Sequence, residues 1–222
     1  MRSALGFLGL LFFASSFLAA QDSDSLFRRA AALVNASRPA EAEELLGTLI
    51  RKDVANAEAL VLLGFLHLQR ASLSDAEKSF KEALDLRPEH AGARLGLGMT
   101  WARQGLPLRA SREFEKILED RSVGHKARAL WIYSLFVQGR DEDALREARE
   151  TVNRFPHVAD YHNILGLLYQ ARGRPKESFR EFLRSVQLDP RNLPTYFSLI
   201  GHAKAERDWT AVLEWADRKS VV

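Results

Sequence analysis

The sequence predicts an all-α protein, an α-solenoid of about six helix–turn–helix hairpins that are 34 residues long. Three observations support this prediction. The chain repeats every 34 residues from Ser23 onward without insertion or deletion, apolar residues recur at helical spacings, and glycine and proline recur where helices would end and begin. The expected repeats are 23–56, 57–90, 91–124, 125–158, 159–192 and 193–222, with the last one incomplete.

The first helix of each hairpin is indicated by positions 4, 7, 8 and 11 of the repeat, which share one helical face. Position 7 is mostly large and position 8 is mostly small, so a second helix can approach closely at position 8. Position 8 reads Ala30, Gly64, Gly98, Ile132, Gly166 and Ile200. The isoleucine at 132, next to Trp131, predicts a looser or displaced helix contact in the fourth repeat.

The second helix is indicated by positions 20, 24 and 27, and the turns on either side are indicated by glycine and proline. Position 24 reads Leu46, Phe80, Phe114, Ala148, Phe182 and Ala216. Glycine at position 15 favours the end of the first helix, and proline at position 17 favours the start of the second. Proline at position 32 ends the second helix. These glycines and prolines are Gly105, Gly139, Gly173, Pro39, Pro107, Pro175, Pro88, Pro156 and Pro190.

Two repeats carry the pattern most completely, with small residues at positions 8, 20 and 27, an aromatic residue at 24 and a proline at 32. They contain Leu60, Leu63, Gly64, Ala76, Phe80, Ala83 and Pro88, and Leu165, Gly166, Tyr169, Ser178, Phe182, Ser185 and Pro190. In these residues the chain resembles the tetratricopeptide repeat family over 23–222. The resemblance implies a right-handed superhelix whose concave face is lined by the first helices, but a fold alone does not specify a function.

Residues 1–20 differ from the rest of the chain and have the layout of a secretory signal peptide. Arg2 precedes an uncharged, almost wholly apolar run from Ala4 to Leu18, and Ala19–Ala20 precede the next charged residue, Asp22. We expect cleavage after Ala20 and export to the periplasm or the medium. The alternative is that residues 4–20 remain as a membrane anchor.

The composition is that of a folded chain, with 46% hydrophobic and 27% charged residues. A formal charge of only +3 argues against nucleic acid as a partner. Residues 91–140 are locally basic, with nine basic and four acidic side chains. This excess favours either an acidic partner or a solvated helix face. The chain has no cysteine, which excludes disulfides and thiolate metal sites.

By the geometry of the resembled family, positions 2, 5, 9, 12 and 13 point into the concave groove. At positions 5, 9 and 12 these residues are largely apolar, which favours binding of an apolar or amphipathic peptide segment. The alternative is that they pack against neighbouring helices. The predicted groove residues are Val61, Phe65, Leu68, Leu95, Met99, Tyr133, Phe136, Asn163, Leu167 and Phe197. Some members of the resembled family bind a C-terminal carboxylate with Lys at position 5 and Asn at position 9. This chain has Phe27 or Val61 at position 5 and Ala31 or Phe65 at position 9, which argues against such a clamp.

Signals of catalysis, metal binding or a cofactor are weak, so we expect a non-enzymatic protein without a cofactor. The densest histidine group is His157, Asp160 and His162, but its spacing does not match a zinc site on one helix. The chain has neither a glycine-rich phosphate loop nor a nucleophile elbow.

The sequence leaves several explanations open for the end of the chain and for its function. Trp209, Val212, Leu213 and Trp215 give the last helix an apolar face without a capping helix. Either the chain is part of a longer protein, or its C-terminal hairpin packs on a partner, for example on a second copy in a homo-oligomer. The functional hypotheses are a scaffold in the cell envelope, a segment of a larger enzyme, and a carrier for amphipathic client proteins.

Overall fold

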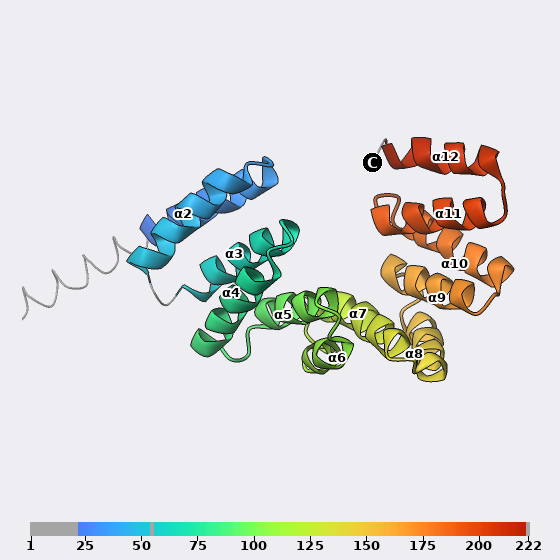
Figure 1. Ribbon diagram of the computed structural model, residues 1–222, viewed down its shortest axis with the longest axis horizontal. Helices are drawn as coiled ribbons and strands as arrows, with labels where there is room; N and C mark the ends of the chain where they lie inside the picture. The colour runs from blue at the N-terminus through green and yellow to red at the C-terminus, as the bar shows by residue number, and fades with distance from the viewer. Residues whose placement is uncertain (1–21, 54–55, 221–222) are drawn as a thin grey trace, which may run out of the picture. The chain divides into compact units, whose positions relative to one another are not determined.

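A computed structural model describes residues 22–53 and 56–220, in which every regular element is a helix (Figure 1). Residues 22–35 form the first helix. The helices that follow are α2 (Pro39–Lys52), α3 (Ala57–Gln69), α4 (Leu73–Leu86), α5 (Ala91–Arg103), α6 (Pro107–Glu115), α7 (Gly124–Val137), α8 (Asp141–Arg154), α9 (Ala159–Ala171), α10 (Pro175–Leu188), α11 (Leu193–Ala205) and α12 (Trp209–Ser220). The predicted all-α solenoid of helical hairpins is thus confirmed.

The predicted leader, residues 1–20, lies outside the described residues. Within the described part of the chain, none of the helices has the length and the apolar character that crossing a bilayer requires. The chain divides into two compact units after Thr100, and each unit is described by itself.

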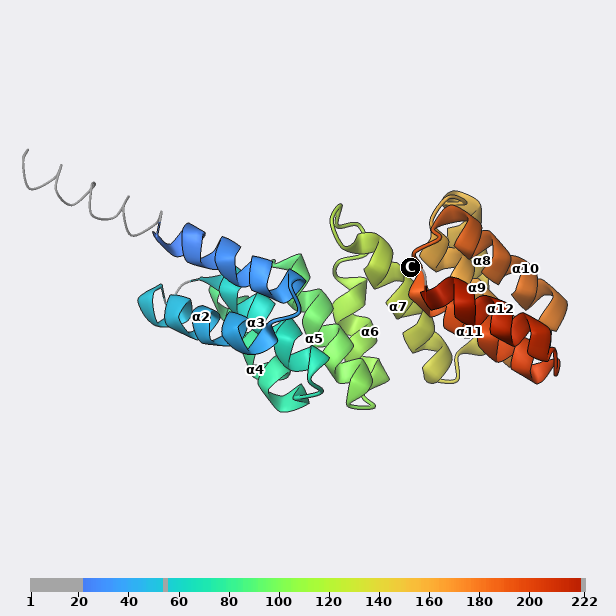
Figure 2. The same cartoon turned by 90° about the horizontal axis from the view of Figure 1, so that it is seen from above.

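In the first unit the helix of residues 22–35 lies beside α2, as Figure 2 shows, and both contribute to a buried cluster with α3. This cluster contains Ala30 and, from α2, Leu46 and Leu49, none of which is exposed to solvent. The next hairpin, α3–α4, is organised around Phe80 of α4, whose side chain is also fully buried. A Cβ added at Gly64 of α3 would lie 2.7 Å from the Phe80 ring, so position 8 must be small wherever position 24 is aromatic.

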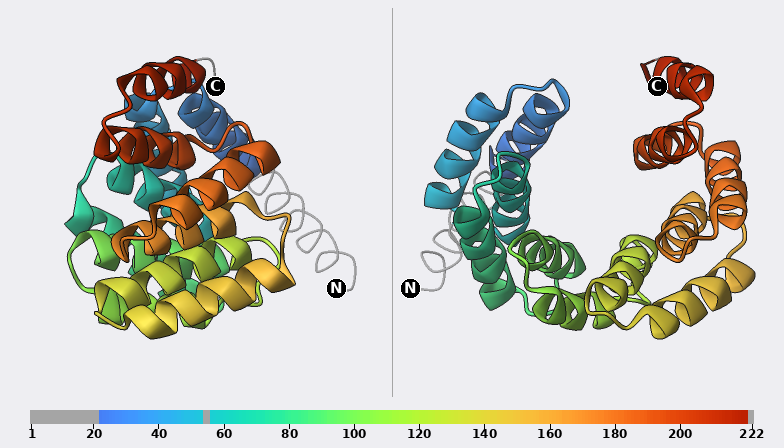
Figure 3. Two further views of the ribbon diagram at one scale, coloured as in Figure 1. Left: turned by 90° about the vertical axis from the view of Figure 1, so that its right-hand side faces the viewer. Right: turned by 45° about the vertical axis from the view of Figure 1, so that its right-hand side comes forward.

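In the second unit each helix packs against the next one along the chain, and the first helices of successive hairpins also meet. Helix α9 contacts both α7 and α11, so these three helices share one side of the unit. The right-hand view of Figure 3 shows α7, α9 and α11 on that side and α8, α10 and α12 on the other. In the last hairpin Trp215 is buried, and its ring centre lies 6.3 Å from that of Tyr196. Leu213 of the same helix is 72% exposed.

The looser helix contact predicted for the fourth repeat is present, because α7 and α8 approach each other closely along less of their length than α3 and α4 or α9 and α10 do. The interface is nevertheless filled, since a small residue on α8 compensates for Ile132. In the fifth repeat Phe182 fills the space beside Gly166, where an added Cβ would lie 2.5 Å from the ring. In the fourth repeat the large residue is Ile132 on α7 and the small one is Ala148 on α8. Both belong to one buried cluster and neither is exposed to solvent. The fourth repeat therefore fills the space between its two helices as the fifth does, although the large side chain comes from the first helix and the small one from the second.

The turn inside each hairpin has a residue with a left-handed backbone at position 15. Gly105, Gly139 and Gly173 have φ values of 75°, 75° and 67°. The three non-glycine residues at this position have nearly the same conformation, with φ of 57° at Ser37, 58° at Ala71 and 57° at Arg207. Since L-residues with a side chain are strained in this region, the turn is set by the repeat and not by glycine alone.

We expect Ala71→Gly to raise the unfolding free energy by roughly 1 kcal/mol, because glycine adopts a positive φ without the strain of a Cβ. Gly139→Ala should lower it by about the same amount. A Cβ added at Gly139 would meet no described atom within 4 Å, so the effect isolates the backbone conformation. Urea denaturation of both variants measures these changes. Equal stability of the two variants and the parent would contradict the argument.

The third repeat ends differently from the second, fourth and fifth, since it has no proline at position 32. Helix α6 has 9 residues where α8 and α10 have 14. Asp120 closes the segment that follows: its carboxylate accepts hydrogen bonds from the Ser122 hydroxyl (2.7 Å) and from the backbone N–H groups of Ser122 (2.9 Å) and Val123 (3.0 Å). These bonds lower the pKa of Asp120, and the bond from the Ser122 hydroxyl contributes most to that shift. The carboxylate thus holds the turn before α7.

Candidate functional site: a cleft on the first helices of the second unit

A cleft of about 480 Å³ lies on the side of the second unit that α7, α9 and α11 share. Its walls come from these three helices, and most of the lining area is apolar. The lining residues are Lys126, Ala129, Leu130 and Tyr133 from α7, Asp160, Asn163, Ile164 and Leu167 from α9, and Pro194 from α11. Small-molecule and peptide sites are typically concave and apolar with a few polar groups, and this cleft has that character.

Three of the predicted groove residues, Tyr133, Asn163 and Leu167, meet in this cleft. Tyr133 is 44% exposed, and its ring centre is 6.3 Å from that of the half-buried Phe136. Phe197, also predicted, is 60% exposed on α11, one turn beyond Pro194. The structure therefore leaves apolar ring surface open to solvent on both α7 and α11.

The polar groups of the cleft are held in place by neighbouring side chains. The Asn163 amide oxygen accepts a hydrogen bond from the Ser198 hydroxyl at 3.2 Å. One Asp160 carboxylate oxygen accepts a hydrogen bond from the Asn192 amide at 2.8 Å. Both bonds join α9 to the start of the next hairpin, so these acceptors are positioned before any ligand arrives. Asn163 still has its amide N–H groups to offer to a peptide carbonyl.

The predicted groove residues of the first unit present much less surface. Val61, Leu68 and Leu95 are buried, and Val61 of α3 lies against Gly92 of α5. Phe65 and Met99 are half-buried, and Phe65 packs edge-to-face on Phe80 with ring centres 5.1 Å apart. These side chains of the first unit mainly contact other parts of the protein, as in the alternative in which the groove residues pack against neighbouring helices. We therefore place the candidate site in the second unit.

The predicted groove residues did not include three that line the cleft. These are Lys126, Asp160 and Pro194, all at position 2 of the repeat. The signal was available, because position 2 was among those expected to face the groove. A positive and a negative side chain thus stand on adjacent helices at one edge of an apolar cleft. This arrangement favours a peptide with a defined direction or charge pattern.

His162, which belongs to the densest histidine group of the sequence, has a structural role. It is buried, with one ring nitrogen 2.8 Å from a Glu181 carboxylate oxygen and the other 3.0 Å from the Pro156 carbonyl oxygen. The bond to His162 lowers the pKa of the Glu181 carboxyl despite its partial burial. Among the described residues there is no group of three or more His, Cys, Asp or Glu side chains that could hold a metal ion.

Comparisons with known proteins agree with this architecture. The tetratricopeptide repeat family model matches residues 27–77, 66–124 and 130–192, together more than half of the chain. Among curated proteins, the probable UDP-N-acetylglucosamine–peptide N-acetylglucosaminyltransferase SPINDLY of Hordeum vulgare is 29% identical over 158 residues. That match covers 67% of this chain but only 16% of SPINDLY.

Two solved structures are similar to the chain at the level of the fold. PilW, a widely conserved type IV pilus biogenesis factor, superposes with a TM-score of 0.72 at 17% identity, covering 88% of this chain and 90% of PilW. YrrB, a tetratricopeptide repeat protein with an unusual peptide-binding site, gives 0.56 at 17% identity, covering 78% of this chain and 89% of YrrB. With the family model matching most of the repeats, this chain belongs to the tetratricopeptide repeat family.

Proposed function

We propose that the chain is a non-enzymatic interaction scaffold that binds an apolar or amphipathic peptide segment on α7, α9 and α11 of the second unit. The observation that carries the proposal is the apolar cleft at Tyr133 and Leu167, with Phe197 exposed nearby. Exposed aromatic surface beside a polar-edged cleft is typical of a protein-binding site. Solenoids of this kind use the face made by their first helices for binding.

We further propose that the scaffold acts after export, in the cell envelope or outside the cell. The support is the signal-like pattern of residues 1–20 and the likeness of fold to a type IV pilus biogenesis factor. A fusion of residues 1–40 to a reporter that is active only after export tests this proposal. An inactive reporter in the intact host would overturn it.

The binding proposal is tested with peptides selected on the purified protein from a displayed random library, and then measured one by one. Tyr133→Asp and Phe197→Asp should each weaken binding of the selected peptides by at least about tenfold, which is 1.4 kcal/mol. A charge on the cleft surface disfavours apolar contacts, while both positions are exposed enough to keep the fold intact. Circular dichroism checks the helicity.

Leu213→Asp is the matched control, because Leu213 is also exposed but lies on α12, on the side of the hairpins opposite the cleft. It should leave peptide affinity unchanged. Peptides that bind all three variants like the parent protein would show that the cleft is not the site.

The second candidate function is a substrate-binding segment of a larger enzyme. The match to 16% of a glycosyltransferase is the observation that favours it. In that case the chain would select protein substrates for a catalytic part that it does not itself contain. Co-purification of the native protein with a glycosyltransferase activity would support this function over the scaffold.

A further inference from the structure

Position 19 of the repeat, in the first turn of the second helix, differs in the third repeat. Four repeats have a carboxylate there: Glu41, Asp75, Asp143 and Glu177. In three of them it pairs with the arginine at position 16, at 2.6 Å for Arg38–Glu41, 2.9 Å for Arg140–Asp143 and 2.6 Å for Arg174–Glu177. A carboxylate in the first turn also favours the positive end of the helix dipole.

In the third repeat this arrangement is replaced by Leu106 at position 16 and Arg109 at position 19. Helix α6 has no acidic residue in its first turn and no side chain capping its first N–H groups. An arginine at this place opposes the helix dipole instead of complementing it. A residue that breaks the local rule of its own repeat indicates a role other than helix stability.

Two clefts flank α6, and Arg109 and Arg112 line both of them. One, of about 710 Å³, also includes Leu106, Leu108 and Arg140. Leu108 is 63% exposed. Neither Arg109 nor Arg112 forms an ion pair with a described residue. Unpaired guanidinium groups beside exposed leucines give this face both a positive charge and an apolar contact surface.

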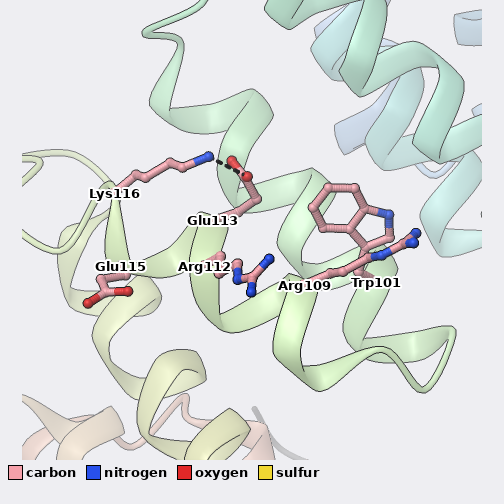
Figure 4. A pocket seen from close by; sticks show the side chains of 6 residues that line it. All are labelled: Trp101, Arg109, Arg112, Glu113, Glu115 and Lys116. Carbon is pink, nitrogen blue, oxygen red and sulfur yellow. Dashed lines mark hydrogen bonds and ion pairs between the residues drawn. The ribbon is translucent and has the colours of Figure 1, made fainter.

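The other cleft, of about 590 Å³, is lined by Trp101 near the end of α5 and by side chains of α6 (Figure 4). Its two carboxylates, Glu113 and Glu115, lie away from Arg109 in this view, and Glu113 is paired with Lys116 at 2.6 Å. The Trp101 indole N–H is buried and has no acceptor among the described residues. The end of the cleft near Arg109 thus presents the guanidinium groups of Arg109 and Arg112 without a carboxylate that pairs with them.

From these observations we propose that the face formed by α6 and the turn before it is a second docking site, which binds an acidic segment of a partner protein carrying an apolar residue beside its carboxylates. Arg109 and Arg112 form the charge-assisted bonds to the carboxylates, and Leu106 and Leu108 contact the apolar residue. This face lies on a second helix, so it is distinct from the cleft on α7, α9 and α11. The two sites together would let the scaffold hold two segments at once.

The test measures binding of a short synthetic peptide of alternating glutamate and leucine to the full chain, by fluorescence anisotropy at low and at physiological salt. Arg109→Glu should weaken binding by at least about tenfold. This variant restores the carboxylate that four other repeats carry at the same position, so it should fold at least as well as the parent. Its melting temperature checks this.

Arg184→Glu, the same charge reversal at an exposed position of α10, controls for general electrostatic attraction and should change the affinity less than about twofold. Three results would each overturn the proposal: equal loss in both variants, equal binding of a lysine–leucine peptide, or stronger binding of single-stranded oligonucleotide than of the acidic peptide. Tyr133→Asp should leave the acidic peptide bound, which separates this site from the proposed peptide cleft.

Discussion

Replacing Phe80 with alanine is expected to lower the unfolding free energy by about 3–5 kcal/mol, the usual cost of emptying a buried phenylalanine site. The side chain is not exposed at all. Its ring fills space left by two glycines, Gly64 of α3 and Gly96 of α5. Since neither glycine has a side chain that could move into the gap, the cavity should collapse poorly. A loss of this size is a large share of the ~5–15 kcal/mol that stabilises a typical domain.

Guanidinium denaturation followed by circular dichroism measures this effect on the full chain. Phe197→Ala provides the matched control, because it removes the same atoms from a side chain that is 60% exposed. The control should cost less than about 1 kcal/mol. If both variants lost the same small amount, Phe80 would not be the centre of the α3–α4 hairpin.

The hairpin pattern could be predicted from the sequence because it depends on short-range chemistry. Helices α4, α6, α8 and α10 all begin at position 17 of the expected repeat, at Leu73, Pro107, Asp141 and Pro175. The turn before each of them is set by a left-handed residue two positions earlier. Such turn signals act within a few residues, so a strict period reveals them without knowledge of the tertiary structure.

The binding surface was harder to predict, because exposure depends on the neighbouring hairpin. Val61 and Phe197 both occupy position 5, yet Val61 is buried against the next first helix while Phe197 is open to solvent. The position within the repeat determines the direction of a side chain but not whether a neighbour covers it. For the same reason, the repeat pattern could not separate the buried Leu68 and Leu95 from the exposed Tyr133.

The compensation of the large Ile132 by the small Ala148 was visible in the sequence, but only when positions 8 and 24 of the repeat are compared together. Position 8 is large and position 24 is small in the fourth and sixth repeats, and the reverse holds in the second, third and fifth. Read alone, Ile132 indicates a looser or displaced helix contact. Read with Ala148, it indicates that the large side chain comes from the other helix. Packing is a property of the pair, since the interior conserves volume more strictly than it conserves the identity of either residue.

This interpretation predicts strong coupling between the two positions. Ala148→Phe alone should cost about 1–3 kcal/mol, because a ring would be forced against Ile132. Ile132→Gly alone should cost about 3–5 kcal/mol, because it opens a cavity and places glycine inside α7. The double variant recreates the arrangement of Gly166 and Phe182 in the next repeat. It should therefore recover a large part of both losses.

A double-mutant cycle by urea denaturation measures this coupling, and we expect an interaction energy of about 2–3 kcal/mol in favour of the double variant. Ile132→Gly combined with Leu213→Phe is the control, since Leu213 is exposed on α12 and is not part of the cluster around Ile132. That pair should be additive within about 0.5 kcal/mol. If Ile132→Gly with Ala148→Phe were also additive, the two side chains would not share one volume, and α7 and α8 would have to pack by contacts other than the exchange described above.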